Sequence, residues 1–318
     1  MRSRFLCLNT IAALLLSFDV AAAETQSNTF FCVHDDQSDS RSDTSFSVAQ
    51  ERRVERSIPY SAVAGAGNKT SLDVYAPSSN GEGPVIVWIH GGGWHKGDKA
   101  NVQDKPTVFN DRGMLLISIN YRLHPATDYK GQAGDIARAV RWVHDHANEY
   151  GGSAERIFVM GHSAGAHLAA LVSTDPRYLE AEGLKLHAIK GAILLDGGGY
   201  DIPRQFELVA TRPRSIELFR RVFTDDVEKQ KDASPITHVA TDKSIPPFLI
   251  LHVADRRVST IQSQAFGKKL NEAGVRAQVV AAEDKTHATI NREIGKPGDV
   301  PTRRIFEFLK GMLRMEAE

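Results

Sequence analysis

The stretch IFVMGHSAG, residues 157–165, joins a continuous apolar run to a run of small residues. An uninterrupted apolar run of this kind is typical of a strand buried on both faces. The small residues that continue to Val172 favour a helix. Gly161 and Gly165 flank Ser163 in the pattern G-x-S-x-G, which predicts a sharp turn from strand to helix that exposes the serine hydroxyl. We therefore predict Ser163 to be a nucleophile held on this turn.

Strand and helix patterns alternate on both sides of the turn. An alternating pattern predicts a strand at 72–76, and apolar runs predict strands at 84–89, 114–119, 189–195, 248–253 and 275–281. Helical patterns cover 136–147, 260–271 and 302–315. Because buried strands alternate with helices, the sequence predicts an α/β fold with a mostly parallel central sheet and helices on both faces.

The alternation breaks between residues 197 and 245. This segment contains an amphipathic stretch in which Phe206, Val209, Ile216 and Phe219 stand among many arginines. We predict a small cap insertion around 197–245, placed over the C-terminal edge of the sheet. An ordinary pair of surface helices with no part in a binding site is the alternative.

The N-terminal region does not look like part of the fold. Arg2 and Arg4 precede an apolar run over 5–18, and three alanines follow at 21–23, which is the order of a signal peptide. We predict a signal peptide over 1–23, a secreted or periplasmic protein, and no stable membrane insertion after cleavage, with an uncleaved anchor as the alternative. Polar residues dominate 24–57, where we expect a disordered tail. The folded domain is then expected over 58–318.

Composition excludes several classes of protein. The 39 basic and 39 acidic residues cancel, so no field of one sign exists to attract nucleic acid. Only two cysteines occur, Cys7 and Cys32, and no Cys/His spacing typical of zinc is present. We therefore expect no metal, no other cofactor and no nucleic-acid partner.

A second motif, HGGGW at 90–94, follows the predicted strand at 84–89. Three glycines at the end of a strand leave backbone N–H groups that can point into a site and hold a developing oxyanion. A phosphate-binding loop is a poor alternative, because the Lys-Ser/Thr ending and the G-x-G-x-x-G spacing are both missing.

Taken together, the two motifs resemble the α/β-hydrolase superfamily, in particular the HGGG-type carboxylesterases similar to hormone-sensitive lipase. The resemblance implies the α/β-hydrolase fold and a triad in the order Ser, Asp, His. Asp255 follows the strand at 248–253 in the pattern D-x-x-V, and His287 follows the strand at 275–281. The resemblance also implies that amides of the glycine run and of the residue after the serine form an oxyanion hole, here Gly92, Gly93 and Ala164. Which two of the three glycines at 91–93 contribute is left open at this point.

The sequence offers alternatives to both residues, Asp255 and His287, that the resemblance assigns as partners of Ser163. The acid could instead be Asp196, which ends an earlier strand, or Glu283 or Asp284 beside the histidine. Arg256 directly follows Asp255, and its guanidinium could pair with the carboxylate and compete for the histidine. For the base, His252 lies within a predicted strand and His162 should point away from Ser163.

The predicted function is hydrolysis of a small-molecule carboxylic ester through an acyl-enzyme intermediate. Trp94 and Tyr200 are candidate walls of the substrate pocket, with simple packing as the alternative for each. The elbow at 161–168 is also similar to that of kynurenine formamidases, so an amidase-type hydrolase is an alternative. A catalytically inactive binding module is a third. The oligomeric state and the acyl and alcohol groups remain open.

Overall fold

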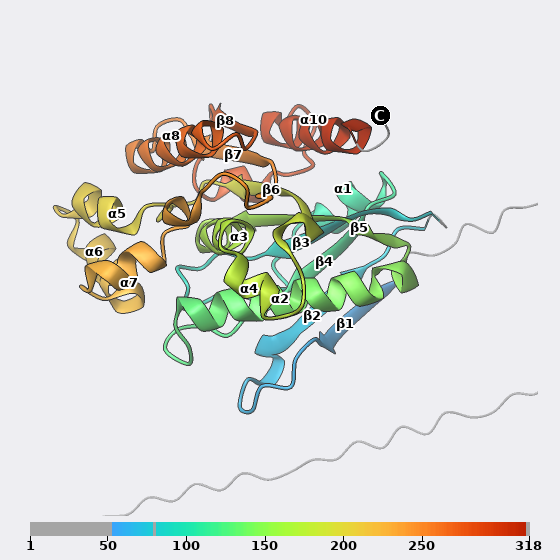
Figure 1. The fold of residues 1–318 in the computed structure, drawn as a ribbon. Coiled ribbons are helices and arrows are strands. Elements are labelled where there is room, and N and C mark those ends of the chain that lie inside the picture. The colour runs from blue at the N-terminus through green and yellow to red at the C-terminus, as the bar shows by residue number, and fades with distance from the viewer. Residues whose placement is uncertain (1–52, 79–80, 316–318) are drawn as a thin grey trace, which may run out of the picture. The chain divides into compact units, whose positions relative to one another are not determined.

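The computed structural model describes residues 53–78 and 81–315. The expected signal peptide at 1–23, and the predicted tail up to residue 52, lie outside the described residues. The described part is built on a sheet of eight strands in the order β1-β2-β4-β3-β5-β6-β7-β8 (Figure 1). The strands are β1 Val54–Pro59, β2 Ser71–Tyr75, β3 Gly83–Ile89, β4 Leu115–Ile119, β5 Gly152–His162, β6 Ile189–Leu195, β7 Phe248–Val253 and β8 Ala277–Ala282.

Strand direction places the functional loops at one edge. β2 is antiparallel to β1 and to β4, whereas β4, β3, β5, β6, β7 and β8 pair in parallel. The prediction of a mostly parallel sheet is confirmed. Because parallel strands end at the same edge, the residues that follow β3, β5, β6, β7 and β8 lie along that edge.

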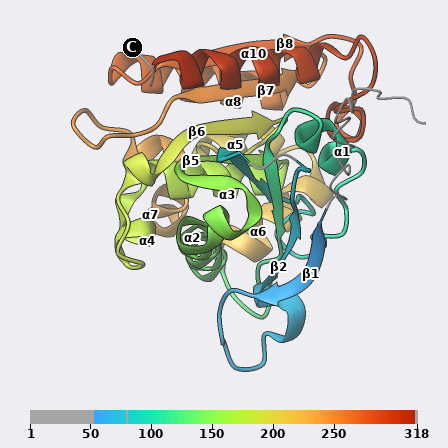
Figure 2. The ribbon, with the colours of Figure 1, turned by 90° about the vertical axis from the view of Figure 1, so that its right-hand side faces the viewer.

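Helices cover both faces of the sheet. They are α1 Lys105–Asn110, α2 Tyr129–His146, α3 Ala164–Thr174, α4 Pro176–Glu180, α8 Arg257–Glu272, α9 Thr289–Arg292 and α10 Val300–Met315, with 3-10 turns η1 Gly67–Thr70, η2 Ala147–Tyr150 and η3 Leu186–Ala188. Side chains alternate along β3, so Val87 packs in the core shared with α2, α3 and α8, while Trp88 packs in the core shared with α1 and α10. Helix α10 lies across β6 and β7 (Figure 2).

The folded domain begins earlier than predicted. Strand β1 starts at Val54 and pairs with β2, so residues 54–57 belong to the sheet and not to the tail. The strand is mostly exposed at the edge of the sheet and carries Glu55 and Arg56, which gave it the composition of a solvated segment. Charged residues are typical of edge strands, where they discourage pairing with other chains.

The segment predicted as a cap consists of short helices between β6 and β7. They are α5 Ile202–Val209, α6 Pro213–Phe223, α7 Val227–Asp232 and the 3-10 turn η4 Pro235–His238. Figure 1 shows α5, α6 and α7 grouped together beyond one end of the sheet. The apolar residues of α6 face inward: Phe219 and Phe223 are buried and pack on Trp94 from the HGGGW loop.

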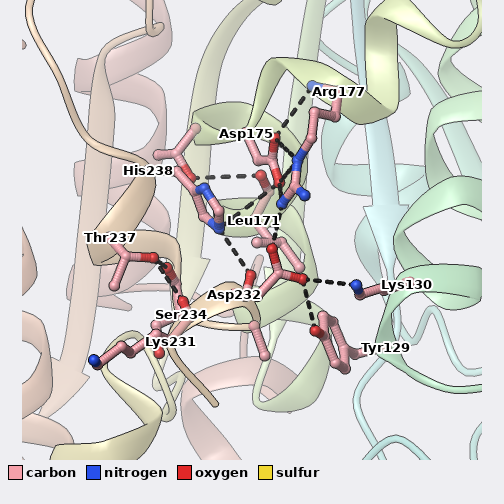
Figure 3. A network of polar contacts seen from close by, with 12 residues as sticks. Tyr129, Lys130, Leu171, Asp175, Arg177, Lys231, Asp232, Ser234, Thr237 and His238 are labelled. Carbon is pink, nitrogen blue, oxygen red and sulfur yellow. Dashed lines mark hydrogen bonds and ion pairs between the residues drawn. The ribbon is translucent and has the colours of Figure 1, made fainter. Parts of the chain in front are cut away.

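A network of charges ties the end of this cap to the body of the domain. The carboxylate of Asp232, the last residue of α7, accepts hydrogen bonds from the Tyr129 hydroxyl at 2.8 Å and from Arg177 Nη2 at 2.7 Å. Arg177 also donates to the buried carboxylate of Asp175, and Lys130 pairs with Asp232 at 3.1 Å (Figure 3). The cap is therefore fixed to α2 and α4 at its C-terminal end.

Within the part of the chain that the structure describes, no helix combines the length and the apolar character needed to cross a membrane.

Candidate active site

Ser163 lies on a strained turn between β5 and α3. Its backbone has φ 57° and ψ −119°, a combination that costs a non-glycine residue free energy and that holds the side chain out of the sheet edge. Gly161 and Gly165 make the turn possible. A Cβ on Gly161 would lie 2.3 Å from the Gly165 oxygen, and one on Gly165 would lie 2.2 Å from the Ile89 oxygen. The motif thus permits close contact between β5, α3 and β3.

A chain of hydrogen bonds runs from Ser163 through His287 to Asp196. His287 Nε2 lies 3.0 Å from Ser163 Oγ, and His287 Nδ1 lies 2.6 Å from Asp196 Oδ2. An ionised carboxylate only accepts, so Nδ1 carries the proton and donates it to Asp196. Nε2 then has a free lone pair toward the serine hydroxyl. This is the arrangement that a base needs to take the Ser163 proton.

The carboxylate in this hydrogen-bond chain belongs to Asp196, whereas the structure does not bring the predicted acid, Asp255, to His287. Asp255 is exposed, and no contact joins it to His287 among the described residues. The order of the strands explains the difference. Asp196 directly follows β6, the neighbour of β5, and the Ser163 amide donates to the Leu195 oxygen at 3.0 Å. Asp255 follows β7, one strand farther away.

Asp196 is buried and receives several donors. Its Oδ1 accepts from the Ser259 hydroxyl at 2.6 Å and from the Val253 amide at 3.1 Å, while Arg256 and His287 both donate to Oδ2. Burial works to raise the pKa of Asp196. The hydrogen bond from His287, the charge of Arg256 and the bonds to Ser259 and Val253 outweigh burial and hold that pKa well below its usual range.

Arg256 pairs with a carboxylate, as the sequence suggested, but its partner is Asp196 and not Asp255. Its guanidinium pairs with Asp196, and its Nη1 lies 2.5 Å from His287 Nδ1. Two donors therefore converge on the single oxygen Oδ2. The side chain of Arg256 is 44% exposed, so the pair lies at the border of the buried site.

The His162 side chain bonds to the backbone of His287. Its Nε2 lies 2.7 Å from the backbone oxygen of His287, and because a carbonyl can only accept, Nε2 is the donor. The two imidazole rings are 4.6 Å apart. Burial lowers the pKa of His162 to about 3, and the neighbouring His287 acts in the same direction, so the ring stays neutral. Among the described residues its hydrogen-bond partner is the His287 oxygen and not Ser163.

The predicted oxyanion amides differ in their position. Gly93 and Ala164 line the same cavity as Ser163 and His287, whereas Gly92 does not. The carbonyl of Gly92 accepts from the amides of His95 and Lys96 and so closes a tight turn. The amide of Ala164 opens helix α3 and has no carbonyl of a preceding turn to bond.

The chain can be compared with known proteins once this geometry is described. A protein-family model named BD-FAE matches residues 72–270. The chain belongs to the BD-FAE family. This is an α/β-hydrolase family, so the fold implied by the resemblance is confirmed.

Individual proteins similar to this chain carry the names of ester hydrolases or esterases. The protein named probable carboxylic ester hydrolase LipM of Mycobacterium tuberculosis is 31% identical over 229 residues, which cover 68% of this chain and 52% of LipM. Esterase 2 of Thermogutta terrifontis has a TM-score of 0.61 and 27% identity, covering 84% of this chain and 94% of its own. Esterase B of Lactobacillus rhamnosis has a TM-score of 0.70 at 20% identity, covering 85% and 88%, and shows the fold alone. The chain spans about half the length of the curated relatives it matches.

The cavity of this BD-FAE member is small and lies between the sheet edge and the cap. Its volume is about 220 Å³, and its walls include Val209, Leu218 and Phe219 from α5 and α6. The segment predicted as a cap therefore contributes directly to the site. At this volume the cavity is below the range of typical drug-sized pockets, so it fits a short group.

Of the two aromatic residues predicted as pocket walls, Trp94 lines the cavity and Tyr200 does not. Tyr200 is fully buried and stacks on Phe266 at 5.0 Å, so its role is packing. Trp94 is also mostly buried and is held by its indole N–H, which donates to His167 Nδ1 at 3.2 Å.

His167 is a site-supporting residue that the sequence analysis did not single out. It lies one turn after Ser163 in α3, accepts from Trp94, and donates from Nε2 to the Ala233 oxygen at 2.8 Å. It thereby joins the HGGGW loop, the elbow helix and the end of the cap. Its position four residues after the serine on a buried helix was the available signal.

The other rivals named from the sequence take no part in the hydrogen-bond chain. Glu283 and Asp284 are exposed, and His252 is buried with its Nδ1 beside the Thr260 hydroxyl at 3.1 Å. Among residues 53–78 and 81–315, no group of three or more His, Cys, Asp or Glu side chains could hold a metal ion.

Proposed function

We propose that the protein is a carboxylic ester hydrolase that uses Ser163, His287 and Asp196 as a catalytic triad. The observation that supports this most strongly is the continuous chain Ser163–His287–Asp196, with links of 3.0 and 2.6 Å, at the wall of a cavity. The lowered pKa of Asp196 keeps its carboxylate ionised, and the bond from His287 Nδ1 to that carboxylate directs Nε2 toward Ser163.

The mechanism follows from these positions. Ser163 Oγ attacks the acyl carbon while His287 Nε2 takes its proton, and the amides of Gly93 and Ala164 stabilise the oxyanion, with Gly92 as the alternative donor. Collapse of the tetrahedral intermediate breaks the ester bond, and the leaving alkoxide takes the proton from Nε2. Water then attacks the acyl-enzyme by the same route, and the carboxylic acid is released.

The relatives support the reaction class. LipM and esterase 2 carry the names of ester hydrolases, and esterase 2 is described in a form phosphoramylated by tabun. Organophosphorus compounds of this type react with activated nucleophiles, which agrees with a serine that has its own base.

A short acyl group fits the site best. The cavity holds about 220 Å³, and esterase 2 is described with propionate and with butyrate bound. We therefore expect turnover to peak at acyl chains of a few carbons and to fall for long chains.

A labelling experiment tests the proposal. Purified protein is treated with an alkyl fluorophosphonate, and the modified peptide is identified by mass spectrometry, alongside initial rates on p-nitrophenyl esters of rising chain length and on N-formylkynurenine. We expect a single adduct on Ser163, loss of activity in proportion to labelling, and preference for short esters. An adduct on another residue, with Ser163 unmodified, would refute the nucleophile. Turnover of N-formylkynurenine well above every ester would identify an amidase.

We also propose that the protein is exported. The order of Arg2 and Arg4, an apolar run and small residues up to residue 23 supports a signal peptide. N-terminal sequencing of protein recovered from an exported fraction should begin at Glu24. Recovery of the uncleaved chain in the cytoplasm alone would contradict export.

A further inference from the structure

The active-site cavity is lined by more positive than negative charge. Arg212 and Arg256 are the basic residues among its lining groups, and Asp196 is the acidic one within the described part of the chain. The Asp196 carboxylate is already occupied by His287, Ser259, Val253 and Arg256. Arg212, an exposed residue at the edge of the cavity, therefore has no second carboxylate in the wall to match its charge.

Among the cap arginines, Arg212 and Arg214 lack a carboxylate partner within the described residues, and of these two Arg212 alone lines the cavity. Arg204 pairs with Glu207, and Arg220 and Arg221 pair with Glu217, Arg220 also with Asp225. The guanidinium of Arg212 makes no ion pair or hydrogen bond with any of the described residues, and yet it lines the cavity. Its backbone forms the N-cap of α6, so the positive end of that helix dipole lies at the same wall.

Two neutral polar residues line the same cavity as Arg212. The buried amide of Gln205 accepts a hydrogen bond on Oε1 from the Gly199 amide at 3.3 Å, which directs its NH₂ group elsewhere, and Gln205 lines the cavity. The Ser215 hydroxyl lines it as well. Arginine, an amide NH₂ and a hydroxyl together form the kind of donor set that binds a carboxylate.

We propose that the ester cleaved at Ser163 carries a carboxylate of its own, and that Arg212 is the residue that selects it. The apolar residues Val209, Leu218 and Phe219 hold the short carbon chain, and the carboxylate lies against Arg212 with Gln205 and Ser215 as further donors. This inference rests on the proposed ester hydrolysis. It adds the substrate class, a short anionic ester such as a hemiester of a dicarboxylic acid.

The test compares an anionic with a neutral ester of the same carbon chain. Monomethyl glutarate carries the charge on the acyl side, with dimethyl glutarate as its neutral partner, and acetoxyacetate carries it on the alcohol side, with acetoxyacetamide as its neutral partner. For each pair the measured quantity is the ratio of kcat/KM, anionic over neutral, in wild type, Arg212→Gln, Arg212→Lys and Arg214→Gln. Arg214 is the matched control, because it is exposed two residues away and does not line the cavity.

We expect Arg212→Gln to lower the ratio about tenfold for at least one pair, since charge-assisted bonds are strong but this side chain is partly solvated. Arg212→Lys should retain most of the ratio, and Arg214→Gln should leave it within twofold of wild type. The pair that responds identifies the side of the ester that bears the charge. Because each variant serves as its own reference, a partly unfolded preparation does not change the ratio.

The inference is overturned if Arg212→Gln leaves both ratios within twofold of wild type, or if Arg214→Gln lowers them equally, which would indicate only a general surface field. Hydrolysis of neutral esters with unchanged ratios would refute the anionic substrate and leave the proposed function intact. Failure of the wild type to cleave either neutral or anionic esters would refute both.

Discussion

The two ends of the hydrogen-bond chain through His287 are built in different ways. Residues close in sequence fix the Ser163 end, because Gly161 and Gly165 allow one strained turn between β5 and α3. Residues from distant segments fix the Asp196 end, where the Val253 amide, the Ser259 hydroxyl and Arg256 converge on one carboxylate. The position of the proposed nucleophile is set by a local motif, whereas the position of the proposed acid is set by the assembled sheet edge.

The largest effect should come from the motif end. Ser163→Ala removes the attacking oxygen and should lower kcat by about a millionfold, as in other dissected triads, while the elbow keeps its fold. Rates on a short neutral ester and the circular dichroism spectrum of the variant check this together. Activity within tenfold of wild type in a folded variant would show that Ser163 is not the nucleophile.

A smaller effect is expected at His287, where the Ser163 end and the Asp196 end of the hydrogen-bond chain meet. His162→Leu removes the donor to the His287 backbone oxygen, a bond of 2.7 Å, and should lower kcat about tenfold. KM should change less, because His162 does not line the cavity. His162→Gln keeps a donor of similar reach and should recover part of kcat. Equal losses in both variants would mean that the ring acts by packing and not by this bond.

A separate effect concerns the stability of the segments that carry the two motifs. Burial lowers the pKa of His90 and of His167 to about 4, while histidine in an unfolded chain titrates near about 6.5. The unfolded state therefore takes up protons first as the pH falls. Stability should be lost progressively between about pH 6.5 and 4, by roughly 1.4 kcal/mol per pH unit for each histidine.

Urea unfolding at pH 7, 6 and 5 measures this loss. The dependence on pH should be shallower in His167→Gln than in wild type, and unchanged in the control His187→Gln, since His187 is exposed. If the free energy of unfolding changed equally with pH in all three proteins, His167 would not contribute to this loss of stability.

The sequence predicted what depends on local pattern. The buried strands, the helix after Ser163 and the glycine loop at 90–94 follow from apolar runs and motif spacing. Strand β1 was missed because half-exposed edge strands have no continuous apolar signal. Family resemblance placed His287 within reach of Ser163, and the structure agrees on that contact.

The acid could not be assigned in this way. Asp196 and Asp255 both follow buried strands that end at the same edge, so their patterns in sequence are equivalent. The choice depends on the backbone after each strand. Asp196 has φ 43° and turns its carboxylate toward β7 and His287, while the chain after Asp255 enters α8 and leaves that side chain in solvent. The position of Tyr200 also depends on tertiary contacts, because its stacking on Phe266 buries it away from the cavity.

The central claim, that Asp196 and not Asp255 completes the triad, is tested most directly by one pair of isosteric variants. kcat/KM on a short neutral ester is measured for Asp196→Asn and Asp255→Asn. Asp196→Asn should lower it by about 10⁴-fold, because an amide beside Nδ1 favours the wrong tautomer of His287. Asp255→Asn should stay within about threefold of wild type, since the exposed Asp255 side chain makes no contact with His287 in the described structure. A crippled Asp255→Asn beside an active Asp196→Asn would contradict the account.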